Sequence, residues 1–292
     1  MIESFLKYIE FEKRYSKHTV ISYKNDLEQF NIFLSNLDQQ LNLQSVVYPH
    51  IRSWVITLVE DGISPSSVNR KMASLRSYYK FLMKSGALKK DPTIQLKALK
   101  TSKRLPQFAQ ESEMQRLFDL VDFGNDFTGK RDELMMELLY ATGIRRSELI
   151  ALKVDSINLG KSQIKVLGKR NKERIIPLNT EVAELIQKYL KMRDEAFGNT
   201  NNFLLLTDKG EQLYDGFVYR KVKRYLGATT SLEKKSPHIL RHTFATHLLN
   251  NGADLNAVKE LLGHSSLAAT QVYTHNSLDK LKKVFEQAHP KA

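Results

Sequence analysis

The sequence predicts a mainly α-helical protein with two domains and a small antiparallel β-sheet in the second domain. A length of 292 residues favours two domains over one, and a hydrophobic fraction of 41% is enough to build a core in each. Apolar residues recur at helical spacing along most of the chain. The spacing changes toward two only between Ile157 and Leu178, where we expect the sheet.

The first domain, residues 1–96, is predicted to contain four helices. The first helix runs from Met1 to about Tyr15, and the second follows the capping side chains of Ser16–Thr19. The third covers about His50–Glu60, and the fourth opens at Ser64-Pro65, where proline suits the first helical turn. Because the connections are short, we expect the four helices to pack together as a small bundle.

A linker and a second domain follow. Residues 97–106 are polar and basic and have no clear period, which predicts a linker before a second domain at 107–292. The second domain opens with helices near Glu111–Val121 and Gly129–Tyr140. In the sheet region, alternating apolar residues predict antiparallel strands whose loop holds Lys169–Lys172.

The rest of the second domain is predicted to be mainly helical. Helices resume at Thr180, and Asn202–Thr207 is expected to form a short strand. From about Pro237 the helical pattern continues to the end of the chain. The last element, a tail helix over 277–288, is amphipathic and can pack on its own domain.

The net charge of +13 is concentrated in one segment. From Arg70 to Arg104 there are eleven Lys or Arg residues and only one acidic residue, Asp91. This concentration is typical of a surface that binds a nucleic acid, although a solvated helix face with a charged linker has the same pattern. Four of these cations lie on the fourth predicted helix and are candidate DNA contacts: Arg70, Lys71, Arg76 and Lys80.

Composition excludes several kinds of chemistry. There are no cysteines, so disulfides, thiolate zinc sites and cysteine nucleophiles are excluded. No stretch approaches the roughly 18 apolar residues of a membrane helix. The start, Met1-Ile2-Glu3, lacks the basic and apolar pattern of a signal peptide. We therefore expect a cytoplasmic protein without membrane association.

Basic residues and a tyrosine recur in short motifs through the second domain. The motifs are ATGIRRSEL at 141–149, GKRNKER at 168–174, PHILRH at 237–242 and LLGHSS at 261–266. Six side chains in or after them can hold a phosphate, move protons or attack: Arg145, Lys169, His238, Arg241, His264 and Tyr273. Taken singly, each residue has an ordinary interpretation as a surface or core side chain. Only the joint pattern predicts a site.

These ordered motifs resemble the tyrosine recombinases, the site-specific DNA recombinase and integrase family, and above all its Xer branch. The resemblance covers nearly the whole chain, from YSKHTVISY at 15–23 to YTH at 273–275. It includes the first arginine motif and the lysine hairpin that ends in IIPL at 175–178. It implies a two-domain clamp around DNA, with a four-helix SAM-like bundle followed by a catalytic domain.

The resemblance implies a covalent mechanism. Tyr273 would attack a backbone phosphodiester, form a 3′-phosphotyrosyl bond and free a 5′-hydroxyl, so that the strand can be rejoined without ATP. Arg145 and Arg241 would stabilise charge on the non-bridging oxygens. Lys169 would give a proton to the departing 5′-oxygen.

The resemblance also assigns supporting residues. His238 would assist proton transfer at the tyrosine, His264 would hydrogen-bond the phosphate, and Glu148 would support the site without reacting. The remaining basic residues of the lysine hairpin are expected to contact DNA: Arg170, Lys172 and Arg174. Because cationic side chains surround the phosphate, neither a metal nor another cofactor is expected.

The implied partners are double-stranded DNA with a specific recombination site and further protomers. Four protomers, identical or including a paralogous recombinase, would act on two duplexes, with the tail docked in a neighbouring protomer. A DNA translocase is a candidate activator, and the implied role is resolution of chromosome or plasmid dimers. The alternatives are a mobile-element integrase or invertase, a type IB topoisomerase, and a non-catalytic architectural DNA-binding protein.

Overall fold

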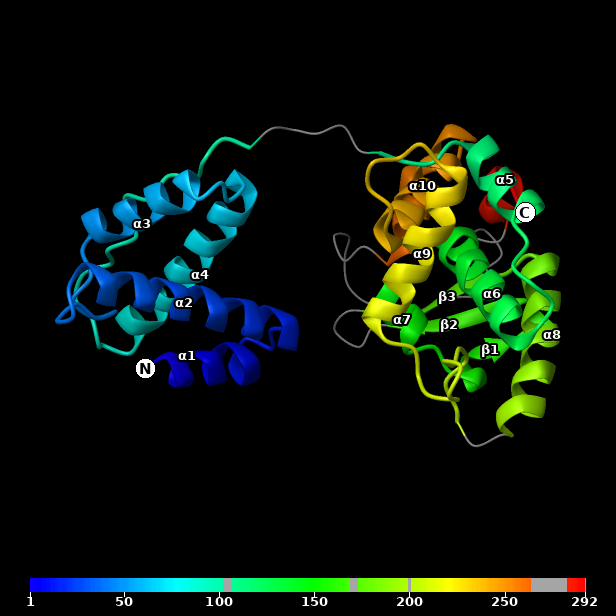
Figure 1. The fold of residues 1–292 in the computed structure, drawn as a ribbon, viewed down its shortest axis with the longest axis horizontal. Coiled ribbons are helices and arrows are strands. Elements are labelled where there is room, and N and C mark those ends of the chain that lie inside the picture. The colour runs from blue at the N-terminus through cyan, green and yellow to red at the C-terminus, as the bar shows by residue number, and fades with distance from the viewer. Residues whose placement is uncertain (102–106, 169–172, 199–200, 264–282, 292) are drawn as a thin grey trace. The chain divides into compact units, whose positions relative to one another are not determined.

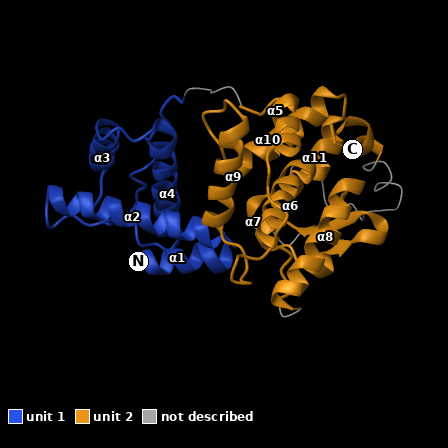
Figure 2. Cartoon of the chain, turned by 45° about the vertical axis from the view of Figure 1, so that its right-hand side comes forward, with its two compact units in different colours: residues 1–104 blue, residues 105–292 orange. Residues whose placement is uncertain are grey.

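In the computed structural model, the chain forms two compact units, residues 1–104 and residues 105–292 (Figure 1, Figure 2). The boundary between them falls within the predicted linker, 97–106. The structure describes residues 1–101, 107–168, 173–198, 201–263 and 283–291. No helix in these ranges combines the length and the apolar character needed to cross a membrane.

Unit 1 is helical throughout its described secondary structure. Its elements are α1 (Ile2–Lys7), the π-helix η1 (Tyr8–Glu12), α2 (Lys17–Leu37), α3 (Tyr48–Glu60) and α4 (Pro65–Lys84). The Ser16 hydroxyl caps α2 by accepting the N–H of Thr19 at 3.3 Å, as its sequence predicts. The first helix ends earlier than expected, because its last turn is π-helical and Arg14 turns the chain with a φ of 52°.

Aromatic side chains from all four α-helices fill the core of unit 1. Phe5, Phe30, Trp54 and Tyr78 are buried there. The rings of Phe30 and Trp54, from α2 and α3, lie 4.8 Å apart between centroids, and Phe5 meets Tyr78 of α4 edge-on. Burial of these large rings together with the aliphatic side chains around them stabilises the bundle.

Unit 2 contains helices around a small antiparallel sheet, which confirms the predicted fold class. Its helices are α5 (Glu111–Leu120), α6 (Phe127–Thr142), α7 (Arg146–Ile150), η2 (Val154–Ser156), η3 (Leu159–Lys161), α8 (Thr180–Phe197), α9 (Asp215–Thr229), α10 (Pro237–Asn250) and α11 (Leu255–Leu262). Its strands are β1 (Ile157–Asn158), β2 (Gln163–Leu167) and β3 (Glu173–Pro177), in the order β1-β2-β3.

Helix α6 forms the centre of unit 2. Its second half, from Leu134 to Thr142, is buried on every side and packs against α8 and α10 (Figure 1). Strand β2 pairs with β3 in a register that sets Ile164 opposite Ile176 and Val166 opposite Arg174. The buried face of the sheet therefore includes one charged residue, Arg174, among aliphatic side chains.

The predicted strand at Asn202–Thr207 is wrong, because the segment makes only isolated bridges, Lys153 with Phe203 and Leu206 with Gln212. Backbone groups of loops and two side chains together pair its backbone: the N–H of Leu204 donates to the Leu152 carbonyl at 2.8 Å, and the N–H of Thr207 donates to the Glu211 carbonyl at 2.7 Å. The N–H of Leu206 donates to the Tyr189 hydroxyl at 3.2 Å, and its carbonyl accepts from Arg131 at 3.4 Å. This apolar segment is thus buried without pairing as a strand of a β-sheet.

The described part of the tail, 283–291, packs on its own unit. Residues 283–288 are helical, and Phe285, Ala288 and His289 are buried in the core of unit 2. The His289 ring stacks on Phe285 with centroids 5.0 Å apart. Burial lowers the pKa of His289 to about 3, so this imidazole is neutral at physiological pH.

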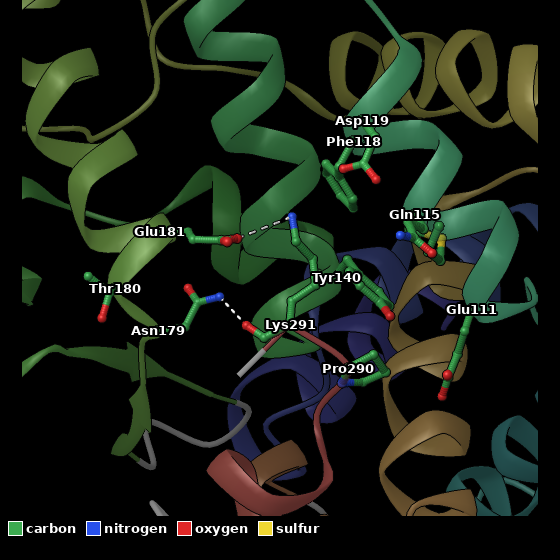
Figure 3. A pocket seen from close by; sticks show the side chains of 11 residues that line it. Glu111, Gln115, Phe118, Asp119, Tyr140, Asn179, Thr180, Glu181, Pro290 and Lys291 are labelled. Atoms are coloured by element: carbon green, nitrogen blue, oxygen red, sulfur yellow. Dashed lines mark hydrogen bonds and ion pairs between the residues drawn. The ribbon is translucent and has the colours of Figure 1, made fainter.

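Lys291 anchors the end of the tail in a polar seat, which we call the tail seat. The seat comprises Phe118, Glu137, Asn179 and Glu181. The Lys291 ammonium pairs with the buried Glu137 carboxylate, lies 3.7 Å from Glu181 and sits 4.0 Å from the centroid of the Phe118 ring. The Asn179 amide donates to the Lys291 carbonyl, and Figure 3 shows both the Glu181 and Asn179 contacts beside an open cavity.

Candidate active site

The turn after α6 positions the first arginine. Gly143 ends α6 with a φ of 57°, and a Cβ there would lie 2.5 Å from the Phe244 ring of α10. Only glycine combines this left-handed conformation with so close an approach. The chain then reverses, and Arg145 becomes the N-cap residue of α7.

Glu148 fixes both the backbone and the side chain of Arg145. The Arg145 N–H donates to Glu148 Oε2 at 2.8 Å, and its Nη1 donates to Oε1 at 2.7 Å. The Arg145 side chain remains 30% exposed. A guanidinium held in this way and open to solvent can receive an external anion.

Arg174 of β3 approaches the same carboxylate from the interior. Its Nη1 and Nη2 donate to Glu148 Oε1 and Oε2 at 2.9 and 2.8 Å. Burial would raise the pKa of Glu148, but the hydrogen bonds and charges of Arg174 and then of Arg145 lower it to about 2. The carboxylate is therefore ionised at neutral pH.

Arg241 joins the cluster from α10. It is buried, and its Nη1 and Nη2 donate to the carbonyls of Gly143 and Leu262 at 2.5 and 2.6 Å. Burial, followed by the charges of Arg145 and Arg174, lowers the pKa of Arg241 to about 9, while Glu148 opposes this change. The three guanidiniums outnumber the one carboxylate, so the cluster carries a net positive charge at neutral pH.

Several predicted site residues are thus brought together and others fall outside the described ranges. Arg145, Glu148 and Arg241 lie in one cluster, and His238 is exposed one helical turn before Arg241 on α10. The other three predicted catalytic residues and two cations of the lysine hairpin lie outside the described residues: Lys169, His264, Tyr273, Arg170 and Lys172. Within the described ranges, no three His, Asp or Glu side chains gather as a metal site would require.

The position of Arg174 differs from the predicted DNA contact. The residue is 3% exposed, and Glu148 and the Leu261 carbonyl occupy its guanidinium. The sequence of β3 indicates that Arg174 is buried, because side chains alternate between the two faces of a strand and Arg174 shares the face of Ile176. A charge on that face must find a buried partner.

The four cations predicted to contact DNA from α4 have different surroundings. Arg70 and Lys71 both pair with the buried Asp26 carboxylate of α2, and Ser74 donates to it at 2.6 Å. Lys71 is only 13% exposed, and the Arg76 guanidinium donates to the Leu96 carbonyl at 2.5 Å. Lys80 is exposed. These contacts give Arg70, Lys71 and Arg76 a structural role within unit 1.

Taken together, the cluster can stabilise a doubly charged oxyanion. Arg145 offers a partly exposed fork of donors, and Arg241 adds a second positive charge behind it. Guanidiniums held by fixed partners suit a phosphoryl group, whose oxygens gain charge in the transition state of displacement.

Two family models match the chain. The model of the Phage integrase family matches residues 107–279. The model described as Phage integrase, N-terminal SAM-like domain matches residues 2–86. The two matches correspond to the two structural units.

Named relatives match along the whole length. The chain is 40% identical to the Tyrosine recombinase XerC of Staphylococcus carnosus (strain TM300), over 99% of this chain and 97% of that protein. It is 37% identical to the Tyrosine recombinase XerD of Staphylococcus haemolyticus (strain JCSC1435), over 100% of this chain and 99% of that protein.

Solved structures share the fold. The XerH site-specific recombinase bound to palindromic difH substrate, in a post-cleavage complex, matches with a TM-score of 0.74 and 21% identity, over 97% of this chain and 83% of that one. The Tn1549 transposon integrase in complex with transposon right end DNA matches with a TM-score of 0.71 and 21% identity, over 97% and 98%.

Proposed function

Since the chain belongs to the phage integrase family and is a site-specific tyrosine recombinase, we propose that it resolves DNA dimers by a metal-independent transesterification at Tyr273. The observation that carries this mechanism is the guanidinium cluster around Glu148, where Arg145 and Arg241 offer two positive charges to one phosphate. Cytoplasmic action follows from the proposed substrate.

The proposed reaction has two balanced steps. The Tyr273 oxygen gives its proton to His238, bonds to a backbone phosphorus and displaces the 5′-oxygen, which takes a proton from Lys169. In the second step, a 5′-hydroxyl from the other duplex gives its proton to Lys169 and attacks the phosphotyrosine, and the released tyrosine takes its proton back from His238. Arg145 and Arg241 stabilise the non-bridging oxygens in both steps, while His238 and His264 assist with proton transfer and phosphate binding.

We propose that both units contact one duplex, with unit 1 and unit 2 acting as a clamp. The net charge of +13 supports such a polyanionic partner. Arg170 and Lys172 of the lysine hairpin are proposed as further phosphate contacts, as is the exposed Lys80 of α4.

Recombination should proceed in excess EDTA without ATP. Guanidiniums supply the positive charge that a metal would otherwise supply, and the phosphotyrosyl bond retains the energy of the phosphodiester. The substrate is a supercoiled plasmid carrying two copies of a target site mapped by DNA protection in cells. The expected products are two rejoined circles.

Three outcomes would contradict this proposal. Loss of cleavage on chelation, with recovery on adding magnesium, would show that the mechanism needs a metal. Relaxation of supercoils without exchange between the sites would favour a type IB topoisomerase. Target sites within one mobile element, instead of near the replication terminus, would favour an integrase or invertase over a dimer resolvase.

The salt dependence of DNA binding should separate Lys80 from Lys71. A variant that makes one phosphate contact fewer should show a slope of log affinity against log salt that is flatter by roughly 0.9. We expect that change for Lys80→Ala, because this residue is exposed. Lys71→Ala should leave the slope unchanged, since Asp26 and Gln29 already hold its ammonium. Fluorescence anisotropy over a salt series measures both slopes, and equal slopes for the two variants would contradict this assignment.

We propose that the active assembly is a tetramer in which each tail seat receives the tail of a neighbouring protomer, identical or paralogous. A DNA translocase is the proposed activator of that assembly. The tail occupies its own seat in the single chain, and the same contacts suit an identical tail from a neighbour. Such an exchange would couple the protomers that act on two duplexes.

Charge reversal distinguishes a tail that binds the seat of its own protomer from a tail that binds the seat of a neighbour. Glu137→Lys and Lys291→Glu each place like charges in the seat, so each variant alone should recombine poorly. In a mixed tetramer in which the two variants alternate, residue 137 of every seat meets residue 291 of opposite charge from the neighbour. Recombination should therefore recover. Gel assays of the single variants, the mixture and the doubly substituted chain measure this. If only the doubly substituted chain recovers, the tail stays on its own protomer.

A further inference from the structure

Arg174 is the most deeply buried arginine of the cluster, and its guanidinium makes three hydrogen bonds, more than that of Arg145 or Arg241. Its two terminal nitrogens bind the two oxygens of Glu148 at 2.9 and 2.8 Å. Its Nε donates to the Leu261 carbonyl at 2.9 Å. Its side chain is only 4% exposed and therefore has no open face for DNA. Any effect of Arg174 on catalysis must therefore act through the residues that it contacts.

Glu148 transmits the position of Arg174 to Arg145. Glu148 Oε1 accepts from Nη1 of both arginines, and Oε2 accepts from Arg174 Nη2 and from the Arg145 backbone N–H. The carboxylate therefore has its orientation set by both arginines. Without Arg174, Glu148 would keep only the Arg145 donors and could rotate with them.

Arg174 also joins three segments that carry predicted catalytic residues. It belongs to β3, which follows the hairpin segment of Lys169. Through Glu148 it reaches α7, and through Leu261 it reaches the last turn of α11, shortly before His264 in the sequence. The Gly263 backbone passes so close that a Cβ there would lie 3.0 Å from Arg174 Cδ, at a φ of +64°.

We propose that Arg174 is a positioning residue of the transesterification, which sets the orientation of Arg145 through Glu148 and fixes β3 to α7 and α11. This proposal rests on the recombinase activity proposed above. Arg174 itself does not touch the scissile phosphate. Its planar fork is required, because an ammonium cannot bind both carboxylate oxygens and a carbonyl in one plane.

The test compares Arg174→Lys with a matched control. Arg193→Lys makes the same change at another buried arginine of unit 2, whose partners are Asp194 and the Asn201 carbonyl. We measure the rate of single-turnover cleavage of a nicked suicide substrate, and the DNA affinity, for each variant. Both are measured at a temperature well below the midpoint of its thermal unfolding. Each rate is divided by the concentration of protein that can bind DNA. We expect Arg174→Lys to lose on the order of 10²-fold in cleavage rate, as misplacement of a charge-stabilising group does, with affinity unchanged. Arg193→Lys should change only the unfolding midpoint.

A double-mutant cycle and the pH profile separate positioning from plain stability. If Arg174 acts through Glu148, then combining Arg174→Lys with Glu148→Gln should lower the rate no further than the worse single change. Arg174→Gln should move the acid limb of the rate profile to higher pH, because Glu148 loses the partner that most lowers its pKa. A merely structural role would scale the rate equally at every pH.

Each outcome supports or overturns a different proposal. Unchanged cleavage by Arg174→Lys, or fully additive losses in the cycle, would overturn the positioning role while the wild-type protein still forms its covalent adduct. Should Arg174→Lys not fold, Arg174→Gln decides by the shift of its acid limb, and that shift should disappear when Glu148→Gln is added, because the titrating carboxyl is then gone. Absence of any adduct with the wild-type protein would instead refute the proposed function.

Discussion

Replacement of Tyr273 by phenylalanine is expected to abolish DNA cleavage while leaving DNA binding intact. The substitution keeps the ring and removes only the oxygen that attacks phosphorus, so the loss should reach the detection limit of the assay. A nicked suicide substrate, run on a denaturing gel, measures the protein–DNA adduct. A mobility-shift titration of the same variant measures binding.

A second tyrosine of unit 2 provides the control. Tyr219 of α9 is exposed, and Tyr219→Phe should form the adduct at the wild-type rate. An adduct formed by Tyr273→Phe would show that another tyrosine is the nucleophile. Loss of adduct together with loss of binding would show that Tyr273 contributes to affinity and not only to chemistry.

The second large effect is expected at Lys169. If its ammonium protonates the leaving 5′-oxygen, Lys169→Ala should slow cleavage by on the order of 10² to 10⁴, because an alkoxide leaves poorly without an acid. A bridging sulfur leaves readily without protonation. A 5′-phosphorothiolate substrate should therefore restore most of the rate of Lys169→Ala in the same single-turnover assay.

Arg241→Ala is the matched comparison for this chemical rescue. Its guanidinium is assigned to the non-bridging oxygens, so a better leaving group should not restore its rate to the same degree. If sulfur leaves Lys169→Ala as slow as before, then Lys172 or a histidine becomes the better candidate for the acid.

The helices and the sheet could be predicted because local signals coincide with the packed structure. The α2 and α4 helices begin after Ser16 and Ser64, whose hydroxyls cap them, and the alternation of Ile164 and Val166 corresponds to a real buried face. The strand predicted at Asn202–Thr207 was wrong. An apolar run indicates that a segment is buried, but it does not indicate which groups will bond to its backbone. Its partners, which include the Leu152 carbonyl and the Tyr189 hydroxyl of α8, depend on tertiary packing.

The site shows the same division between local pattern and tertiary contact. The motif around Arg145 and Glu148 could be identified from its sequence, because the two residues contact each other within one turn of α7. The role of Arg174 could not, since its bond to Glu148 joins segments that only the fold brings together. For the same reason, the sequence could not predict that Asp26 holds Arg70 and Lys71.

The most direct test of the proposed mechanism is to identify the atom that links protein to DNA. Wild-type protein is trapped on a suicide substrate in EDTA, digested with trypsin and analysed by mass spectrometry, with each DNA end labelled separately. We predict a single DNA-linked peptide, modified at Tyr273 and attached to a 3′-phosphate. Attachment at another residue, attachment to a 5′-phosphate, or the absence of any linked peptide from active protein would contradict the mechanism.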